Sequence, residues 1–523
     1  MNKFSCSIAL VAALCAQPVW SQTAVPQVTD HAAARFLDQA TWGPTPASIS
    51  QLQAVGFTEW LHRQFSAQPS YLPDQPILNA ATGKPNRDLR PVQLAFFENA
   101  LNGNDQLHQR VAFALSEIWV VSQLDVGYAY AFPPYWQVLA NNAFNNYRDI
   151  IKAMTLSPAM GRYLNMANNN KGNAAKGTSA NENYARELMQ LFTLGLDKLN
   201  MDGTMALDAN HNPIPTYDQT VVVNMAKLLT GWTYPTAPGK AAKTNNPPYY
   251  ISQMFPVEKE HDESAKILFD GVNVPAGQTA EEDLDGLLDA LMAQDTMAPF
   301  VSKQLIQHLV TSNPSPAYVE RIANVFLDSG AGVRGDMKAV VTAILMDPEA
   351  RDGDDPGTTA SASLGHLREP VLFMANILRG LNAKLTAQSA PYNNATNMGQ
   401  QLFYSPSVFS YFSPQYRNQQ GAPAPEFQIY STATAANRAD IVNSILYGKL
   451  DKGTTVDLTP FVDKASDLNA LIDYIDSVFL YHSMSSDLRQ AAIQAAEATS
   501  NPESRAKDAL YIVLTSGEYQ IVH

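Results

Sequence analysis

Cysteine is almost absent from this chain of 523 residues, which contains only two. Both lie in the opening stretch MNKFSCSIALVAALCAQPVWSQ, where Lys3 is followed by an apolar run and then by small residues up to Ser21. This is the pattern of a secretory signal peptide, so we predict a signal peptide over residues 1–21. The mature chain, 22–523, would then have no cysteine. Disulfides and thiol chemistry are excluded from it, and its stability must come from a buried core.

Basic residues are also scarce, because 35 Lys and Arg face 49 Asp and Glu, for a formal net charge of -14. A negative surface disfavours nucleic acid and anionic membranes as partners. Beyond the signal peptide no run is long and apolar enough to span a bilayer. We therefore expect a secreted or periplasmic protein with no membrane span and no nucleic-acid partner.

Motifs for metals and nucleotides are missing too. The nine histidines form no HExxH or HxH pair, and no P-loop, GxGxxG or GxSxG motif precedes a helix. The sequence therefore predicts neither a metal nor another cofactor.

Helical periodicity is what the chain has in abundance. It predicts an all-α fold: a large multi-helix body with long irregular loops and at most a small β-hairpin, around 205–215. We expect a single domain over 22–523, with a possible subdivision at the acidic, breaker-rich segment 352–363. The predicted helices include 31–40, 90–101, 107–121, 135–154, 216–229, 298–310, 318–327, 336–346, 367–381, 468–481 and 502–515.

The segment NENYARELMQLFTLG, residues 181–195, is the best candidate site. It follows a loop rich in glycine and asparagine and begins a helix whose first turns carry Glu182, Asn183, Arg186 and Glu187. Glu182 and Arg186 stand four residues apart and are expected to pair. One carboxylate held ionised by arginine and another raised in pKa by an apolar setting would suit acid/base catalysis, as in a glycosidase. The alternative is a structural clamp between helices.

Further candidates lie elsewhere in the chain. His261, followed by Asp262, is a candidate base, or alternatively a residue at a helix start that bonds to backbone. Tyr404 and Tyr411 belong to an aromatic run that suits either sugar stacking or core packing. Arg368 and Glu369 form a second possible arginine–glutamate tie.

Two short motifs have structural interpretations. The stretch DANHNPIP resembles a calcium loop but lacks its glycine and its final glutamate, so a hairpin turn is favoured. The triplet Arg334-Gly335-Asp336 precedes an apolar helix, so we expect Asp336 to cap that helix.

Ten collinear segments give the chain a family resemblance. They include AARFLDQATWGPT (33–45), RVAFALSEIWVVS (110–122), NENYARELMQLFTLG, MAKLLTGWT (225–233), HDESAKILF (261–269), LREPVL (367–372) and LYIVLTSGEYQ (510–520). Together they resemble the exported bacterial family catalogued as domain of unknown function 1800. The resemblance implies a secreted or periplasmic helical protein without an established activity. It also implies a pairing with a second exported family that resembles alkaline-phosphatase-like hydrolases. Some members carry a histidine where this chain has Ser116 to Trp119, so no role of that histidine is transferred here.

These observations lead to alternative functions. The first is a cofactor-free hydrolase or lyase acting on extracellular polymer such as polysaccharide. Its catalytic residues would be Glu182, Arg186, Glu187 and His261, and its substrate-binding residues would be Asn181, Asn183, Tyr404 and Tyr411. The second is a non-catalytic binding or assembly partner of the co-exported hydrolase-like protein. A carbohydrate-binding protein without catalysis is the third.

Overall fold

Helices make up most of the chain in the computed structural model, which describes residues 28–355, 361 and 364–522. The described part contains 22 α-helices and three antiparallel two-stranded sheets, so the all-α prediction is confirmed. The predicted signal peptide, both cysteines and most of the predicted linker lie outside the described residues.

In the first half of the chain the helices are α1 (Asp30–Ala40), α2 (Pro46–Ser66), α3 (Arg90–Asn102), α4 (Gln106–Ile118), α5 (Gln123–Val126), α6 (Phe132–Asn142), α7 (Tyr147–Thr155), α8 (Pro158–Tyr163), α9 (Asn183–Glu187) and α10 (Gln219–Leu228). The second half contains α11 (Ala280–Met292), α12 (Met297–Leu309), α13 (Pro316–Leu327), α14 (Met337–Met346), α15 (Pro370–Gly380), α16 (Pro391–Asn397), α17 (Thr432–Tyr447), α18 (Thr459–Val462), α19 (Leu468–Phe479), α20 (Ser486–Glu497), α21 (Pro502–Thr515) and α22 (Gly517–Gln520). The strands pair as β1 (Trp232–Thr233) with β2 (Phe255–Pro256), β3 (Lys266–Ile267) with β4 (Asn273–Val274), and β5 (His366–Leu367) with β6 (Ile521–Val522).

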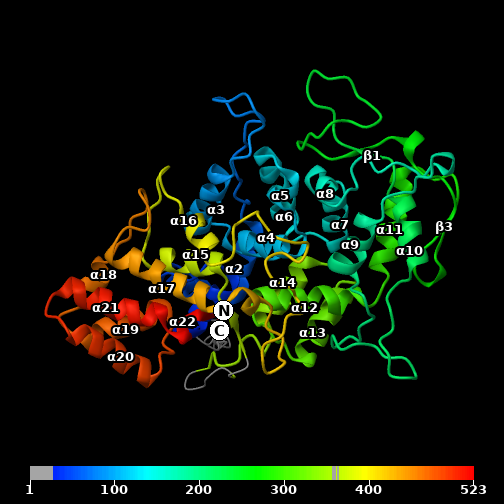
Figure 1. Cartoon of the computed structure of the whole chain (residues 1–523). Coiled ribbons are helices and arrows are strands. Elements are labelled where there is room, and N and C mark those ends of the chain that lie inside the picture. The colour runs from blue at the N-terminus through cyan, green and yellow to red at the C-terminus, as the bar shows by residue number, and fades with distance from the viewer. Residues whose placement is uncertain (1–27, 356–360, 362–363, 523) are drawn as a thin grey trace, which may run out of the picture.

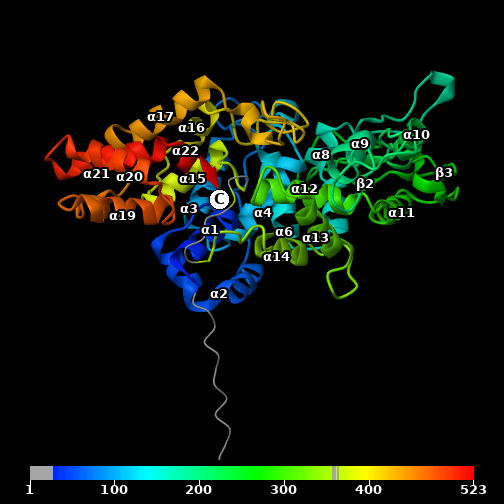
Figure 2. The ribbon, with the colours of Figure 1, turned by 90° about the horizontal axis from the view of Figure 1, so that it is seen from below.

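The helices spread to two sides of a central group. Figures 1 and 2 show α17 to α22 on one side, α9 to α11 with β3 on the other, and α4 and α12 between them. The candidate segment 181–195 therefore lies on the side opposite the C-terminal helices.

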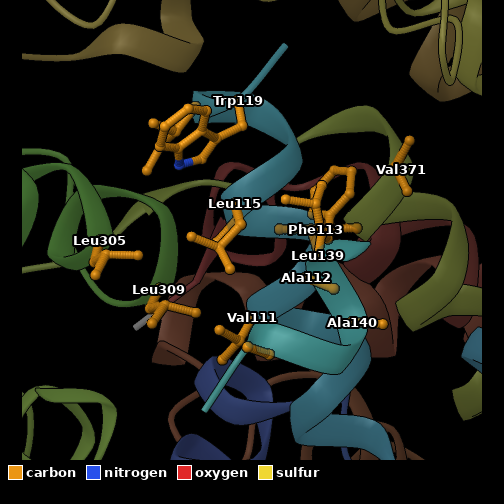
Figure 3. Close-up of a cluster of buried hydrophobic side chains, with 14 of the residues drawn as sticks. Val111, Ala112, Phe113, Leu115, Trp119, Leu139, Ala140, Leu305, Leu309 and Val371 are labelled. Atoms are coloured by element: carbon orange, nitrogen blue, oxygen red, sulfur yellow. The ribbon is translucent and has the colours of Figure 1, made fainter. Parts of the chain in front are cut away.

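Helix α4 is the centre of the core, because all its residues except Ser116 are buried. Figure 3 shows its side chains Val111, Phe113, Leu115 and the following Trp119 among residues of α6, α12 and α15. A helix that is buried on nearly every side is surrounded by other parts of the chain. Its polar residues Gln106, His108, Gln109, Arg110 and Glu117 are buried with it.

Residues far apart in the sequence meet beside α1. Strand β5 pairs with β6, with His366 opposite Val522. Directly after β5, Arg368 forms a buried ion pair with Asp38 of α1, and Arg368 Nη1 lies 2.7 Å from Asp38 Oδ1. The beginning, the middle and the end of the described chain are thus joined at one place.

The predicted cap at Asp336 is confirmed, and Asn501 caps α21 in the same way. Asp336 Oδ1 accepts a hydrogen bond from the amide of Ala339 at 3.1 Å, and Asn501 Oδ1 accepts one from Ser504 at 3.0 Å. Each cap satisfies an amide that the first helical turn leaves free. The triplet 334–336 is therefore the start of α14.

The segment 197–215 forms the predicted hairpin through isolated bridges, with Leu199 opposite Met205 and Leu207 opposite Pro213. At its tip Asp208 Oδ1 accepts from the amides of Asn210 and Asn212, at 2.8 and 2.9 Å. Because this carboxylate oxygen closes a tight turn, the geometry favours the turn interpretation over the calcium loop.

Two further findings concern the whole body. Within the described ranges, no helix combines the length and the hydropathy that crossing a membrane requires. Near the predicted linker, Asp354 forms ion pairs with Arg35 of α1 and with Arg351. The described start of the segment 352–363 is therefore attached to the body, and subdivision there stays a prediction.

Candidate functional site

The segment 181–195 begins as the short helix α9 and continues as a π-helix, η3 (Leu188–Thr193). The amides of Leu194 and Gly195 both donate to the carbonyl of Met189, at 2.8 and 3.0 Å. The predicted apolar face is buried, and Phe192 stacks on Trp119 with the ring centroids 4.3 Å apart. A π-helix is rare and is found frequently at functional sites. The sequence predicted a helix here, but its periodicity did not distinguish this wider form.

Beside α9 lies a hollow of about 460 Å³. Such a volume falls in the range of about 300–1,000 Å³ that small-molecule sites occupy. It is formed by α8, by the asparagine-rich loop that follows and by residues after β1. Its lining consists of Gly161, Arg162, Asn165, Ala167, Asn168, Asn169, Asn170, Lys171, Thr178, Ser179, Asn181 and Tyr234.

The asparagine side chains of this hollow are held by backbone groups. Asn169 Oδ1 accepts from the amide of Asn181 at 2.7 Å, and its Nδ2 donates to the carbonyl of Asn181 at 3.1 Å. Asn168 has φ 63°, accepts from Thr233 Oγ1 at 2.6 Å and donates to the carbonyl of Asn246 at 3.0 Å. Asparagine tolerates this left-handed conformation better than most residues. At these positions the predicted polar loop is fixed by hydrogen bonds and forms one wall of the hollow.

Two of the predicted substrate-binding residues lie at this wall. Asn181 lines the hollow directly. Asn183 donates from its backbone to Asn181 Oδ1 at 2.9 Å and from Nδ2 to Asn165 Oδ1 at 3.2 Å. The first turn of α9 is therefore connected to the lining of the hollow.

Glu182 and Arg186 form the predicted pair, with 3.0 Å between Glu182 Oε2 and Arg186 Nη2. Their side chains are 35% and 40% exposed. Gln219 of α10 bonds to both, donating to Glu182 at 2.8 Å and accepting from Arg186 at 3.3 Å. An ion pair this exposed contributes little stability. Its described contacts connect α9 with α10.

Glu187 lies in a different environment from Glu182. It is half-buried, and burial raises its pKa while the charge of Arg186 opposes the rise. Its negative charge contributes in turn to the raised pKa of Tyr163 and of Tyr217. The hydroxyl of Tyr217 is buried without a hydrogen-bond partner among the described residues. Glu187 is therefore the carboxyl of this segment whose raised pKa best suits it to exchange a proton.

His261 is fully buried, so the structure separates it from solvent. It ends the short helix η4 (Glu258–Glu260), and does not begin a helix as one interpretation expected. Its Nδ1 lies 3.0 Å from the carbonyl of Thr230, and its Nε2 lies 3.0 Å from Asp283. The carboxylate that orients it is Asp283 of α11, since Asp262 bonds to Ser264.

The position of His261 supports the wall of the hollow from behind. Gly231 has φ 87°, and a Cβ added there would lie 3.0 Å from His261. The amide of Gly231 donates to the carbonyl of Asn169 at 2.8 Å. His261 thus acts on the asparagine loop through Gly231 and has no described contact with the hollow itself.

Tyr404 and Tyr411 do not line the hollow. The hydroxyl of Tyr411 donates to the carbonyl of Gln401 and accepts from the amide of Tyr404. Tyr411 is only 9% exposed, and Tyr404 is partly buried against the core. These contacts favour the packing interpretation of the aromatic run.

A buried carboxyl cluster lies on α4 and α15, and the site prediction did not include it. Glu117 of α4 accepts from Ser410 Oγ at 2.7 Å, and Glu369 accepts from Gln400 Nε2 at 2.6 Å. Burial and the charge of Glu369 raise the pKa of Glu117 well above its usual range. His308 and Arg110 lower the pKa of Glu369 against the effect of burial. Opposite shifts in neighbouring acids are a pattern of acid/base pairs and also of buried ion networks.

Sequence reasoning had one clue to this cluster. Arg110 and Glu117 stand at either end of the apolar run 111–115 of α4, and burial of that run on several sides buries them as well. Two nitrogens of Arg110 are buried without a partner among the described residues. Glu369, the second carboxyl of the cluster, is more than 250 positions away from Glu117 in the sequence. Local spacing therefore does not reveal that the two lie close together.

The described residues include no group of three or more His, Cys, Asp or Glu side chains placed to hold a metal ion. The polar groups that line the hollow are amides, hydroxyls and the two cations Arg162 and Lys171.

Comparison with known proteins identifies a family to which the chain is similar. A family model described as protein of unknown function (DUF1800) matches residues 35–521, which is nearly the whole chain. Neither a curated protein nor a solved structure matches the chain.

Proposed function

Since the chain belongs to the DUF1800 family of proteins of unknown function, we propose a function from the hollow beside α9. The protein is exported, binds a segment of an extracellular polysaccharide in this hollow, and cleaves it as a cofactor-free hydrolase or lyase. The observation that carries the proposal is the lining itself, where five asparagines, Thr178 and Ser179 surround about 460 Å³.

Amide and hydroxyl side chains match the chemistry of a sugar. Each asparagine offers two donors and one acceptor oxygen, and each sugar hydroxyl both donates and accepts. Because Asn168 and Asn169 are fixed by backbone bonds, the wall is already ordered before a ligand arrives. Preorganisation lowers the entropic cost of binding.

The proton transfers of cleavage are assigned to Glu187, which does not itself line the hollow but belongs to α9, whose first turn is connected to that lining through Asn183. Its raised pKa makes it the proton donor or acceptor, while Glu182, bound by Arg186 and Gln219, is the second carboxyl of the pair. His261 has no catalytic part in this proposal, because it is sealed behind the wall. Tyr404 and Tyr411 have no part in binding.

The experiment is a screen of extracellular polysaccharides for binding by calorimetry and for new chain ends after incubation. We expect Glu187→Gln to abolish cleavage and to retain binding. Asn181→Ala is expected to weaken binding about tenfold, corresponding to one lost pair of hydrogen bonds. Asn210→Ala, on the exposed hairpin turn, is the matched control and should change neither property.

Two results would overturn the proposal. If no polysaccharide binds, the hollow is not a sugar site. If Glu187→Gln leaves cleavage intact, Glu187 is not the proton-transferring group. Co-purification with a second exported hydrolase-like protein, together with an absence of sugar binding, would favour the assembly-partner alternative.

A further inference from the structure

The charge of the hollow is opposite to that of the protein as a whole. The chain has a formal net charge of -14, yet the lining of the hollow includes Arg162 and Lys171 and no acidic residue. A concave site of one sign concentrates ligands of the opposite sign.

Both cations keep their charge available to a ligand, although Arg162 also interacts with the side chain of Tyr234. Each is exposed, and none of the ion pairs in the described part of the chain includes either of them. Lys171 is fixed at its backbone, where its amide donates to the carbonyl of Glu260 at 2.8 Å. Arg162 faces Tyr234, since burial raises the pKa of Tyr234 to about 12 and the charge of Arg162 opposes that rise. Arg162 and Tyr234 both line the hollow.

The two cations differ in the geometry that they recognise. Arginine presents a planar fork that matches a carboxylate or a sulfate ester with two hydrogen bonds. Lysine provides a compact charge on a flexible stem. The neighbouring asparagines use only part of their hydrogen-bonding capacity within the protein, and the remaining donors and acceptors can bind uncharged hydroxyls. One ring can therefore be recognised by both kinds of group.

We propose that the hollow selects an acidic saccharide, whose negatively charged substituent is bound by Arg162 and Lys171. This inference rests on the proposed function and adds to it the substrate class. The charged substituent is either the carboxylate of a uronate or a sulfate ester, and the experiment separates the two.

The test is calorimetric titration of the full-length protein with four oligosaccharides. These are an oligouronate and its neutral methyl ester, and a sulfated oligosaccharide and its desulfated form. We expect one acidic form to bind at least tenfold more tightly than its neutral counterpart, and the preference to shrink as salt is added. The pair that shows the preference identifies the substituent.

The variants are Arg162→Gln and Lys171→Gln, with Lys176→Gln as the matched control. Lys176 is an exposed lysine of the same loop that does not line the hollow. Each pocket variant should lose most of the preference for the acidic form while retaining the affinity for the neutral form. The control should behave as the unmodified protein, and circular dichroism should show that all variants are folded.

The outcomes separate this inference from the proposed function. If neutral and acidic forms bind equally, the hollow is a neutral-sugar site and only the inference fails. If Lys176→Gln reduces the preference as much as the pocket variants, the effect is general electrostatics and the inference also fails. If none of the four compounds and no polysaccharide binds, both fail.

Discussion

Arg368 and Asp38 form an ion pair in which both side chains are buried, although 330 positions separate them in the sequence. Asn376 donates a further hydrogen bond to Asp38 Oδ1 at 3.0 Å, and the amide of Arg368 donates to the carbonyl of Gln520. The pair therefore joins α1, the residues between β5 and α15, and the end of α22.

Asp38→Asn should strongly destabilise the protein, because it leaves the guanidinium of Arg368 buried without its counter-charge. Loss of one partner of a buried pair costs about 3–5 kcal/mol, measured as the change in the free energy of unfolding by denaturant titration. The control is Glu59→Gln, which removes an exposed pair with Arg63 and should cost less than about 1 kcal/mol. Equal effects of the two substitutions would contradict the prediction.

Glu426→Gln should remove a pH dependence of stability. Burial raises the pKa of Glu426 from 4.5 to about 7. Below pH 4.5 the folded and unfolded states are both protonated and the stabilisation is complete. As pH rises toward 7 the unfolded state loses its proton first, so stability falls, in total on the order of 3 kcal/mol.

The measurement is the free energy of unfolding at several pH values between 4 and 8 for the unmodified protein and the variant. The difference between the two should change across this window and be flat above it. Glu281→Gln, at an exposed position of α11, is the control that should leave the pH dependence unchanged. A constant offset for Glu426→Gln at every pH would show that its pKa is not raised.

Asp283→Asn and His261→Gln should separate a structural from a catalytic role for the buried histidine. Asp283 Oδ2 lies 2.7 Å from Lys266 Nζ and 3.0 Å from His261 Nε2, and all three side chains are sealed. We expect Asp283→Asn to cost about 3–5 kcal/mol, since it leaves a buried ammonium unpaired. His261→Gln should cost about 1–3 kcal/mol. Thermal and denaturant unfolding give both values.

A second substitution tests the cause of this loss. Lys266→Met in the Asp283→Asn background should restore part of the stability, because it removes the unpaired charge. Any polysaccharide cleavage by His261→Gln should keep its pH profile once normalised to folded protein. A shifted profile would return His261 to the catalytic residues.

Asn169→Asp should loosen the wall of the hollow without unfolding the body. The substitution replaces the Nδ2 donor to the Asn181 carbonyl with an oxygen, so an attractive contact becomes repulsive. We expect faster hydrogen exchange at the amides of 178–183 and weaker saccharide binding, with the exchange of α4 unchanged. Asn170→Asp, a neighbouring position without a described side-chain bond, is the matched control for the exchange measurement, and Asn210→Asp, on the exposed hairpin turn, is the control for saccharide binding. Uniform acceleration throughout the chain would mean that Asn169 supports the whole fold.

Local sequence patterns predicted many of the helices, but not the places where a helix breaks or kinks. Caps such as Asp336 and Asn501 act within one turn, and both were predictable from neighbouring residues. The range 135–154 was predicted as one helix, yet it is divided into α6 and α7, with Asn146 capping the second. Helix α2 was not predicted, since Gly56, with φ 77°, interrupts its periodicity.

In the candidate site too, contacts between sequence neighbours were predictable and contacts between distant residues were not. The Glu182–Arg186 pair was predictable because its members stand on one helical face. The hollow depends on Tyr234, Asn246 and Gly231, which reach the asparagine loop only through the folded chain. No spacing within 165–195 encodes these contacts, and the same holds for Asp283 beside His261.

The pairing of β5 with β6 has a kinetic consequence. His366 and Leu367 are bonded to residues 521 and 522, and Arg368 is bonded to Asp38 and Gln520. Contacts between such distant positions require the closure of very long loops and form slowly. During synthesis, which proceeds from the N-terminus, β5 has no partner until residues 520–522 have been made. A protein truncated before Gln520 should therefore remain open at this point and expose α1 to proteases, however well its other helices have formed.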